Sequence, residues 1–465
     1  MKKRIFATLM LAVMLLGILG MAGCNQTTNA QPNFVVPEGG FNTTEQVTIS
    51  FKHTMGANLQ AVLDRYIAEF NKIYPNIKIE HVSAGGWGDI NGAINTEING
   101  GTQPNIAYCY PDHVAMYNLA KSVVTLDNLI ADPNLGLTAE QKADFIESYY
   151  VEGQVYGDGL MYTMPLNKST EVIYYDKTFF QANNLTVPTT WDEMWTVCEQ
   201  IKAIDPSCYP LGYDAEDNWF ITLCEQMKTG YTSASGDKFL FNNDANKAFI
   251  KTLREKYQKG LFTTQELYGA YTSGLFTNQD PTKARCYMCI GSSGGASYQM
   301  PKKDDGTFAF EVGVAPIPQA DASNKKVISQ GPSLCILKGA NTTDQQIMAS
   351  WLFVKFLCTD VNFQAEFSMA SGYMPVLKSV TENEVYAGWL NSANGYENLV
   401  ATCVKVGIEG RDNYFVSPAF NGSSTARTQV GALLIKCISA EATDVDALIN
   451  KAFIDALDEC EFQGG

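Results

Sequence analysis

Residues 46–82 read QVTISFKHTMGANLQAVLDRYIAEFNKIYPNIKIEHV, and this stretch decides the fold. Apolar and polar side chains alternate over residues 46–51, which predicts a β-strand. From Leu59 to Ile73, apolar residues recur at the i, i+3/i+4 spacing of a helix, and Pro75 ends that helix. A second strand is expected at 77–82. Strand, helix and strand at this spacing predict a βαβ unit, and therefore a parallel sheet covered by helices.

The same alternation of strands and helices continues along the chain. Helices are expected at 190–203 and 342–357, each opened by residues typical of a helix N-cap. Further strands are expected at 105–110, 172–175, 284–290, 310–315 and 333–337. A chain of 465 residues is too long for one hydrophobic core. We therefore predict an α/β fold of two lobes.

The N-terminus has the features of a secretory signal. Three basic residues precede an apolar run at 5–19, and Met21-Ala22-Gly23-Cys24 is followed at once by polar residues. The apolar run is shorter than the roughly 20 residues that span a bilayer. Small residues directly before a cysteine resemble the lipobox of bacterial lipoproteins, although Met21 stands where Leu is commoner. We predict a signal peptide at 1–23, lipidation of Cys24 and a flexible tether at 24–44; the alternative is an ordinary signal with a chance cysteine.

Composition excludes some classes of partner. Without residues 1–23 the chain keeps 30 basic and 49 acidic residues, a net charge of about −19. Such a surface repels nucleic acid and anionic lipid head groups, so we expect no nucleic-acid partner and membrane contact through the lipid alone.

Eleven cysteines follow Cys24, most of them in apolar stretches where they replace small core residues. Cys286 and Cys289 have CxxC spacing, but no second pair completes a zinc site, so no metal and no cofactor are expected. The redox state of these thiols stays open.

Several segments together resemble the extracellular solute-binding proteins of family 1, the carbohydrate-type receptors of ABC importers. These segments occur in the order and at the spacing of the family, over roughly residues 46–460. Asn105 and Asp176 differ from the residues that the family usually has at these positions. The segments are IAEFNKIYPNIKI (67–79), GTQPNI (101–106), VYG to MP (155–165), VIYYDK (172–177), VPTTWDE (187–193) and ASGYMPV (370–376).

The resemblance implies two lobes around a cleft that closes on a ligand by a hinge. By the family pattern, lobe 1 comprises 45–165 and 327–376, and lobe 2 comprises 166–326 and 377–465. Ligands of such folds lie at the carboxyl ends of strands, where loops and helix N-termini offer unpaired backbone groups.

A sugar site needs planar aromatic rings for stacking and polar side chains for the hydroxyl groups. By the resemblance, Asp112 stands where the family often has a hydroxyl-binding acid, and Trp219 where it has a stacking aromatic. Trp87 and Trp219 could instead be core residues, and His53 could be a plain surface residue. The candidate ligand-binding residues are His53, Thr54, Asn58, Trp87, Tyr110, Asp112, Trp219, Ser292, Ser293, Gln330 and Tyr373.

Two departures bear on the substrate. Residues 292–295 replace a Trp of maltose-type receptors, and 421–425 lack their second stacking aromatic, which disfavours a long maltodextrin. Residues 417–425 lack a basic residue for a phosphate, and Arg427 lies one turn into the following helix. We therefore expect a mono- or oligosaccharide, with glycerol phosphate or another polar solute as the alternative.

An enzyme is the rival class. Gly291-x-Ser293-x-Gly295 has the spacing of a nucleophile elbow, but all three histidines lie upstream of Ser293, so the hydrolase triad cannot form in its chain order. A glycosidase needs a pair of carboxylates, and nothing in the sequence singles one out. The expectation is a monomeric, lipid-anchored binding protein without catalytic residues, which delivers its solute to a membrane permease.

Overall fold

The computed structural model describes residues 30–392 and 398–464. The predicted signal peptide and Cys24 lie outside these ranges. The chain from Pro32 to Gly465 is one compact unit. Within the described ranges, no helix has both the length and the apolar character that crossing a membrane would require.

The first sheet contains the βαβ unit that the opening stretch predicts. Strands β1 and β2 are parallel and in register from Val47 opposite Ile77 to His53 opposite Ser83. The five strands are, in order across the sheet, β2 (Ile77–Ser83), β1 (Val47–His53), β3 (Ile106–Cys109), β11 (Ser333–Ile336) and β4 (Met164–Pro165). We call this sheet and its helices lobe 1.

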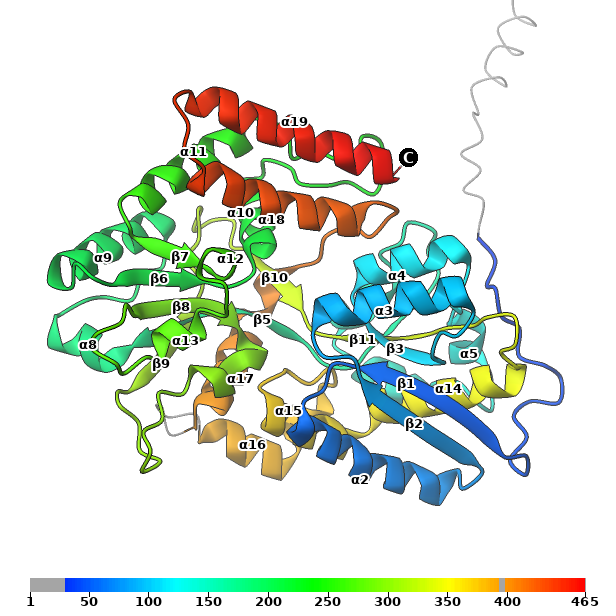
Figure 1. Cartoon of the computed structure of the whole chain (residues 1–465). Coiled ribbons are helices and arrows are strands. Elements are labelled where there is room, and N and C mark those ends of the chain that lie inside the picture. The colour runs from blue at the N-terminus through cyan, green and yellow to red at the C-terminus, as the bar shows by residue number, and fades with distance from the viewer. Residues whose placement is uncertain (1–29, 393–397, 465) are drawn as a thin grey trace, which may run out of the picture. The chain divides into compact units, whose positions relative to one another are not determined.

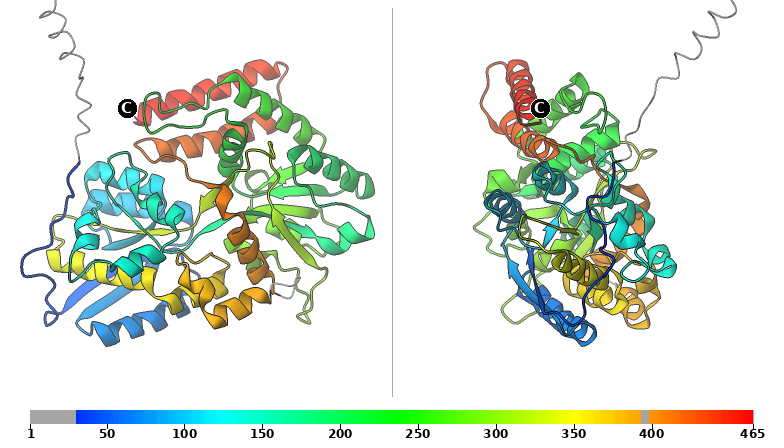
Figure 2. Two further views of the ribbon diagram at one scale, coloured as in Figure 1. Left: turned by 180° about the vertical axis from the view of Figure 1, so that it is seen from behind. Right: turned by 90° about the vertical axis from the view of Figure 1, so that its right-hand side faces the viewer.

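Helices cover both faces of the lobe 1 sheet (Figure 1). Helix α14 runs along one face, as Figure 2 shows in yellow, and Phe353 on this helix contacts Phe51 of β1 and Phe70 of α2. These three rings are fully buried and form part of the lobe 1 core. The helices of lobe 1 are α2 (Ala57–Ile73), α3 (Trp87–Gly100), α4 (Pro111–Tyr117), α5 (Asp127–Ala131), α6 (Ala139–Asp144), α7 (Glu147–Tyr150), α14 (Asp344–Thr359) and α15 (Val361–Ser371).

The second sheet forms the centre of lobe 2. Its middle strand β5 pairs with β8 and β9 antiparallel, whereas β6 pairs with β7 and β8 parallel. The strands are β12 (Tyr414–Phe415), β10 (Val327–Gln330), β5 (Ser169–Asp176), β8 (Cys286–Ser292), β6 (Tyr209–Tyr213), β7 (Phe262–Thr264) and β9 (Val312–Pro316).

Alternate residues of β5 separate the two cores of lobe 2. Ile173 belongs to a large cluster with α9, α10, α11, α18 and α19, whereas Val172 and Tyr174 belong to a smaller cluster with α13 and α17. The sheet is therefore covered on both faces. The helices are α8 (Lys177–Ala182), α9 (Trp191–Ile204), α10 (Glu216–Met227), α11 (Asp244–Gln258), α12 (Gln265–Tyr268), α13 (Ser273–Phe276), α16 (Glu384–Asn391), α17 (Leu399–Gly410), α18 (Ser423–Ser439) and α19 (Val445–Gly464).

The chain passes between the two sheets more than once. It crosses between β4 and β5, returns between β10 and β11, and reaches the second sheet again at β12. The predicted α/β fold of two lobes is confirmed. The assignment of 327–330 to lobe 1 is wrong, because this segment is β10 and pairs with β5 of the lobe 2 sheet.

Residues 33–44 correct the predicted tether at 24–44. The Asn33 side chain donates to the Val123 carbonyl and accepts from the Thr125 backbone N–H, and Phe34 is buried. Further along, Asn42 accepts from Asn76 through its carbonyl oxygen. Because these contacts bind residues 33–44 to lobe 1, this part of the segment is not a free linker.

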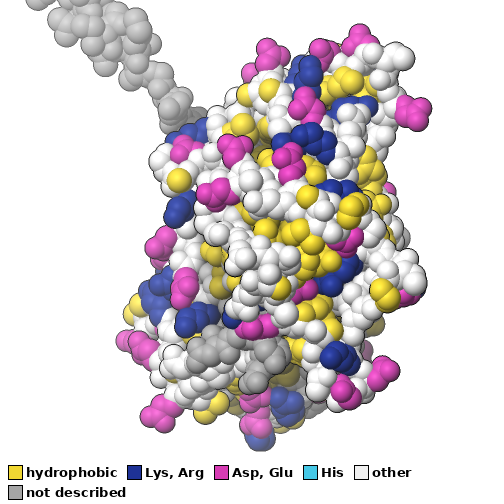
Figure 3. All heavy atoms as spheres, turned by 90° about the vertical axis from the view of Figure 1, so that its left-hand side faces the viewer, with side chains coloured by type: hydrophobic (Ala, Val, Ile, Leu, Met, Phe, Trp, Pro, Cys, Tyr) yellow, Lys and Arg dark blue, Asp and Glu magenta, His cyan; other side chains and the backbone are white. Residues whose placement is uncertain are grey.

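Two other features of the sequence have clear structural counterparts. All eleven cysteines after Cys24 are free and buried, as expected for residues that fill a core. Acidic and basic side chains are interspersed on the outer face of lobe 2 that Figure 3 shows. The negative charge of the chain is therefore not gathered into one patch on that face.

Candidate functional site

A cavity of about 380 Å³ lies between the two lobes. Most of its wall comes from four helix starts, from β10 and from the segment that follows β12. Lobe 1 contributes Trp87, Gly88, Asn91, Tyr110, Pro111, Asp112, His113 and Glu152; lobe 2 contributes Ala215, Asp217, Asn218, Tyr231, Ile328, Ser329, Gln330, Val416, Ser417, Pro418, Ser423, Ser424, Arg427 and Thr428.

Four helices begin at this cavity. The first turns of α3 and α4 reach it from lobe 1, and those of α10 and α18 reach it from lobe 2. The first backbone N–H groups of a helix have no partner within the helix, and they carry the positive end of its dipole. The cavity wall is therefore rich in hydrogen-bond donors that can meet a polar ligand.

An aromatic wall stands on the lobe 1 side. The ring of Trp87 lies 4.3 Å from the ring of Tyr110, centroid to centroid, and stacks on Tyr108 at 6.0 Å with an interplanar angle of 10°. Trp87 is the first residue of α3, after Gly85 at φ +90° and Gly86. Because the ring is packed on one side and part of it faces the cavity, it is a rigid surface for stacking.

Several polar atoms of the cavity wall have no partner. Five lining residues carry a buried side-chain oxygen or nitrogen without a hydrogen bond to any described residue. Buried polar groups in folded proteins are nearly always hydrogen-bonded, to protein, water or ligand. These atoms therefore mark places where a polar ligand or water binds: His113 Nδ1, Glu152 Oε2, Ser329 Oγ, Gln330 Oε1 and Ser417 Oγ.

Arg427 joins the two lobes across the cavity. Its Nε lies 3.5 Å from Oδ2 of Asp112 in lobe 1, and its Nη1 lies 3.0 Å from Oδ2 of Asp217 in lobe 2. Nη1 also donates to Oδ1 of Asn218 at 2.5 Å. Burial alone would lower the pKa of Arg427, but the carboxylates of Asp217 and Asp112 raise it above its ordinary value. The guanidinium is therefore charged, and its Nε and Nη1 are engaged.

The other charged groups at the cavity are neutralised. Glu152 accepts from Nζ of Lys168 at 2.6 Å, and both side chains are buried. Burial lowers the pKa of His113, so its imidazole is neutral near pH 7. Among the described lining residues, the remaining charged side chains are those of Asp112, Asp217 and Arg427.

Four of the eleven predicted ligand residues line the cavity: Trp87, Tyr110, Asp112 and Gln330. Each of the first three follows a strand of the lobe 1 sheet or begins the helix after it, as the strand-end argument requires. Gln330 ends β10.

The residues predicted after β1 do not reach the cavity. His53 is fully buried: its Nδ1 accepts from the Met55 N–H at 3.1 Å, and its Nε2 lies 2.9 Å from Nδ1 of His81. Nε2 of His81 in turn lies 2.9 Å from Asp64. This chain of hydrogen bonds occupies both nitrogens of His53. Thr54 is half-buried beside it, and Asn58 is exposed and donates to the Ala370 carbonyl.

Ser292, Ser293 and Tyr373 lie together, but away from the cavity wall. The hydroxyl oxygen of Ser292 accepts from the Gly294 N–H, and that of Ser293 accepts from the Thr170 N–H. The ring of Tyr373 covers Gly294, since a β-carbon there would lie 3.0 Å from it. The prediction that these three residues bind the ligand is not supported, because backbone and ring contacts already engage them.

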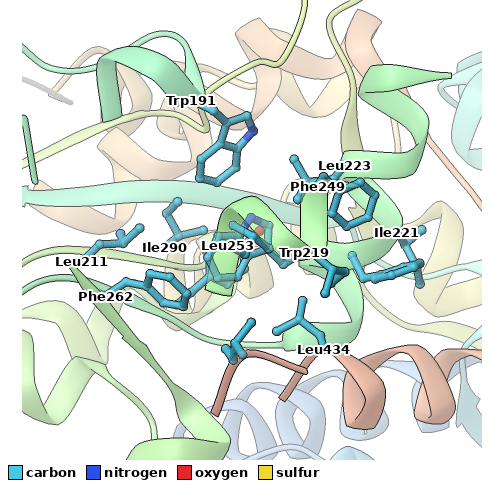
Figure 4. Close-up of a cluster of buried hydrophobic side chains, with 14 of the residues drawn as sticks. Trp191, Leu211, Trp219, Ile221, Leu223, Phe249, Leu253, Phe262, Ile290 and Leu434 are labelled. Carbon is cyan, nitrogen blue, oxygen red and sulfur yellow. The ribbon is translucent and has the colours of Figure 1, made fainter. Parts of the chain in front are cut away.

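Trp219, which was expected to stack on the ligand, is a core residue of lobe 2 and does not line the cavity. Its side chain is fully buried, stacks on Tyr213 at 4.3 Å with an interplanar angle of 7°, and lies among Trp191, Phe262 and Leu211 (Figure 4). No face of the ring is free for a sugar. Its neighbours Asp217 and Asn218 reach the cavity instead.

Sequence reasoning placed Gln330 at the cavity but missed the rest of the lobe 2 wall. Asp217 and Asn218 precede Trp219, and Ser423, Ser424 and Arg427 begin α18. One signal was present: residues three and four apart share a helix face, so Arg427 lies over Ser423 and Ser424 at the start of the helix.

The geometry does not support the alternative of a hydrolase that uses Ser293. The hydroxyl of Ser293 is buried and bonded to backbone, and the three histidines belong to lobe 1 segments. Within the described ranges, no group of three or more His, Cys, Asp or Glu side chains is placed to hold a metal ion.

Solved structures share this fold. The GacH receptor of Streptomyces glaucescens, solved unliganded and with acarbose, matches with a TM-score of 0.68 at 16% identity, over 89% of this chain and 99% of that chain. UgpB from Mycobacterium tuberculosis in complex with glycerophosphocholine matches with a TM-score of 0.70 at 17% identity, over 89% and 98%. At these identities the likeness shows the fold alone.

Curated relatives and a family model extend the match to sequence. The sn-glycerol-3-phosphate-binding periplasmic protein UgpB of Yersinia pestis bv. Antiqua (strain Antiqua) is 26% identical over 346 residues, 72% of this chain and 75% of that protein. UgpB of Salmonella typhimurium is 26% identical over 350 residues, again 72% and 75%. The model described as bacterial extracellular solute-binding protein matches residues 65–393. With its two lobes and the cavity between them, the chain belongs to the family of bacterial extracellular solute-binding proteins.

Proposed function

We propose that this protein is the lipid-anchored substrate-binding protein of an ABC importer, and that it captures a mono- or oligosaccharide and delivers it to a membrane permease. The observation that carries the proposal is the cavity between the lobes, with an aromatic wall on one side and unpaired polar atoms around it. Sugars offer apolar C–H faces and hydroxyl groups, and this wall has an aromatic surface for the first and polar atoms for the second.

The mechanism is capture and closure without chemistry. A ligand that contacts Trp87 in lobe 1 and Asn218 in lobe 2 stabilises the closed form over the open form by the difference in its contacts. The closed form then docks on the permease. No catalytic residue takes part, and the relatives with printed functions are binding proteins.

The anchor is part of the proposal. Membership of an extracellular family supports a site of action outside the cytoplasm. Lipidation at Cys24 would keep the protein at the outer face of the membrane, close to the permease.

A phosphate ester is the second candidate ligand. Residues 417–425 contain no basic residue, as the sequence analysis noted, but Arg427 one turn into α18 lines the cavity. The curated relatives quoted above are named for sn-glycerol-3-phosphate, and one solved relative holds glycerophosphocholine.

Thermal shift of residues 25–465 against panels of sugars, polyols and phosphate esters tests the proposal. A ligand that binds only the folded form raises the melting temperature in proportion to the logarithm of its concentration over Kd. Trp87→Ala should weaken binding of the responding ligand at least tenfold, whereas Trp389→Ala, outside the cavity, should not. Release of product from glycosides or esters would contradict a pure binding function.

A further inference from the structure

The charges at the cavity are unevenly balanced. The wall carries two carboxylates, Asp112 and Asp217, and one guanidinium, Arg427, while Glu152 is balanced by Lys168 behind it. No lysine lines the cavity among the described residues. The wall therefore has a net charge of about −1 near pH 7.

The single cation is already engaged. Arg427 uses Nε for Asp112, and Nη1 for Asp217 and Asn218. A phosphate that bound Arg427 through Nε and Nη1 would displace both carboxylates from the guanidinium, and each would then remain partly buried without its partner. A phosphate that bound through Nη2 alone would lie beside two carboxylates that stay in place. Leaving a buried charge unpaired is strongly unfavourable.

The carboxylates also have free acceptors for a neutral ligand. Each pairs with Arg427 through Oδ2, and neither Oδ1 accepts a hydrogen bond from a described residue. A sugar hydroxyl donates to a carboxylate, whereas a phosphate oxygen without a proton repels it. We infer that the cavity selects an uncharged polyhydroxy ligand and excludes phosphate esters, and that Asp112 and Asp217 impose this selection by occupying Arg427 and the helix starts beside it.

Helix N-termini by themselves favour anions, and those of α3, α10 and α18 meet here. Asp217 lies in the first turn of α10, and Asp112 pairs with Arg427 of α18, so two carboxylates already occupy this favourable potential. Removing their charges would leave Arg427 and the helix starts unopposed. The selection therefore depends on two residues, and it can be reversed. This inference rests on the proposed solute-binding function and names the class of its ligand.

The test compares phosphate binding in the wild type and in the double variant Asp112→Asn/Asp217→Asn. The probes are glycerol 3-phosphate and inorganic phosphate, measured by isothermal titration calorimetry at low and high salt. We expect no binding to the wild type at millimolar probe. The double variant should bind glycerol 3-phosphate at least tenfold more tightly than the wild type, with an affinity that falls as salt rises.

A control variant carries the same change of charge at matched positions. Asp344 and Asp192 are exposed residues in the first turns of α14 in lobe 1 and α9 in lobe 2. Asp192→Asn/Asp344→Asn should leave phosphate binding at the wild-type level. A melting temperature for each variant establishes that it is folded.

The outcomes separate the inference from the proposed function. Binding of glycerol 3-phosphate by the wild type overturns the inference and leaves solute capture in place. A folded double variant that still rejects phosphate also overturns it, since the carboxylates would not be what excludes the anion. A neutral sugar that binds the wild type, while its phosphate ester does not, supports both. Rejection of every neutral sugar in the panel by the wild type overturns the sugar proposal itself.

Discussion

Gly331 lies against Lys168 where the two strands that connect the lobes pass each other. Gly331 has φ +99°, and a β-carbon there would come within 2.7 Å of the Lys168 Cα and 2.6 Å of the Asn167 carbonyl oxygen. Only glycine allows both the backbone conformation and this approach. The relative placement of the lobes thus depends on a position without a side chain.

Gly331→Ala should destabilise the protein by about 3 kcal/mol or more, because the added carbon collides with backbone that cannot move aside. Urea unfolding measures the free energy. Gly269→Ala is the control: Gly269 has φ +79° but open space around it, so that change should cost only about 1 kcal/mol. Equal losses in the two variants would show that conformation alone matters at Gly331.

Substitution of Trp219 should lower stability and leave ligand binding unchanged, whereas substitution of Trp87 should weaken binding. Trp219→Ala removes a fully buried ring from the lobe 2 core and should cost about 3–5 kcal/mol of unfolding free energy. Where this variant is folded, its ligand affinity should stay within a few-fold of the wild type. A tenfold loss of affinity at wild-type stability would return Trp219 to the site.

The buried pair of Lys168 and Glu152 should behave as a unit. Lys168→Met leaves the Glu152 carboxylate without its partner and should cost about 3–5 kcal/mol. The double variant Lys168→Met/Glu152→Gln removes both charges, so it should be more stable than Lys168→Met alone. A double-mutant cycle by urea unfolding measures the coupling, and strict additivity of the two changes would contradict it.

His53 should make stability depend on pH. Burial, reinforced by His81, lowers the pKa of His53 to about 4, against 6.5 for a free histidine. Between these values the unfolded chain binds the proton and the folded chain does not, so this contribution to stability is complete above pH 6.5 and is lost as pH falls towards 4.

The variant His53→Gln isolates that titration from others. Burial raises the pKa of Glu171 to about 8, which gives an opposite slope, with stability lost as pH rises from 4.5 to 8. The difference between wild type and variant should therefore be measured, by urea unfolding at several pH values. If the free energy of unfolding changed with pH in the same way in both proteins, His53 would not be the source of the pH dependence.

The fold could be predicted from the sequence because its signals are local. Alternation over β1 and the helical spacing over α2 depend on neighbours along the chain, and both elements lie where the pattern placed them. The family prediction is confirmed by the match over residues 65–393. The ranges proposed for the lobes remain predictions, apart from the correction at β10.

The site was only partly predictable, because side-chain direction depends on the rotation of each element. His53 follows Ile49 and Phe51 at the strand period of two, and so shares their buried face. Trp219 is turned away from the cavity, while Asp217 and Asn218, two residues and one residue earlier in the helix, reach it. Asp112, which pairs with Arg427 from lobe 1, lies more than 300 residues earlier in the sequence, and no local pattern predicts such a pair.

The eleven buried thiols can serve as intrinsic probes of unfolding. Burial raises the pKa of thiols such as Cys437, to about 11, so they react slowly while the chain is folded. They lie in the cores of both lobes, so unfolding of a lobe uncovers its own thiols, and alkylation under native conditions reports how often each lobe opens, with no added probe. In an oxidising medium the same events would allow mispaired disulfides. The working lifetime of the protein outside the cell would then be set by its unfolding rate rather than by its free energy of unfolding.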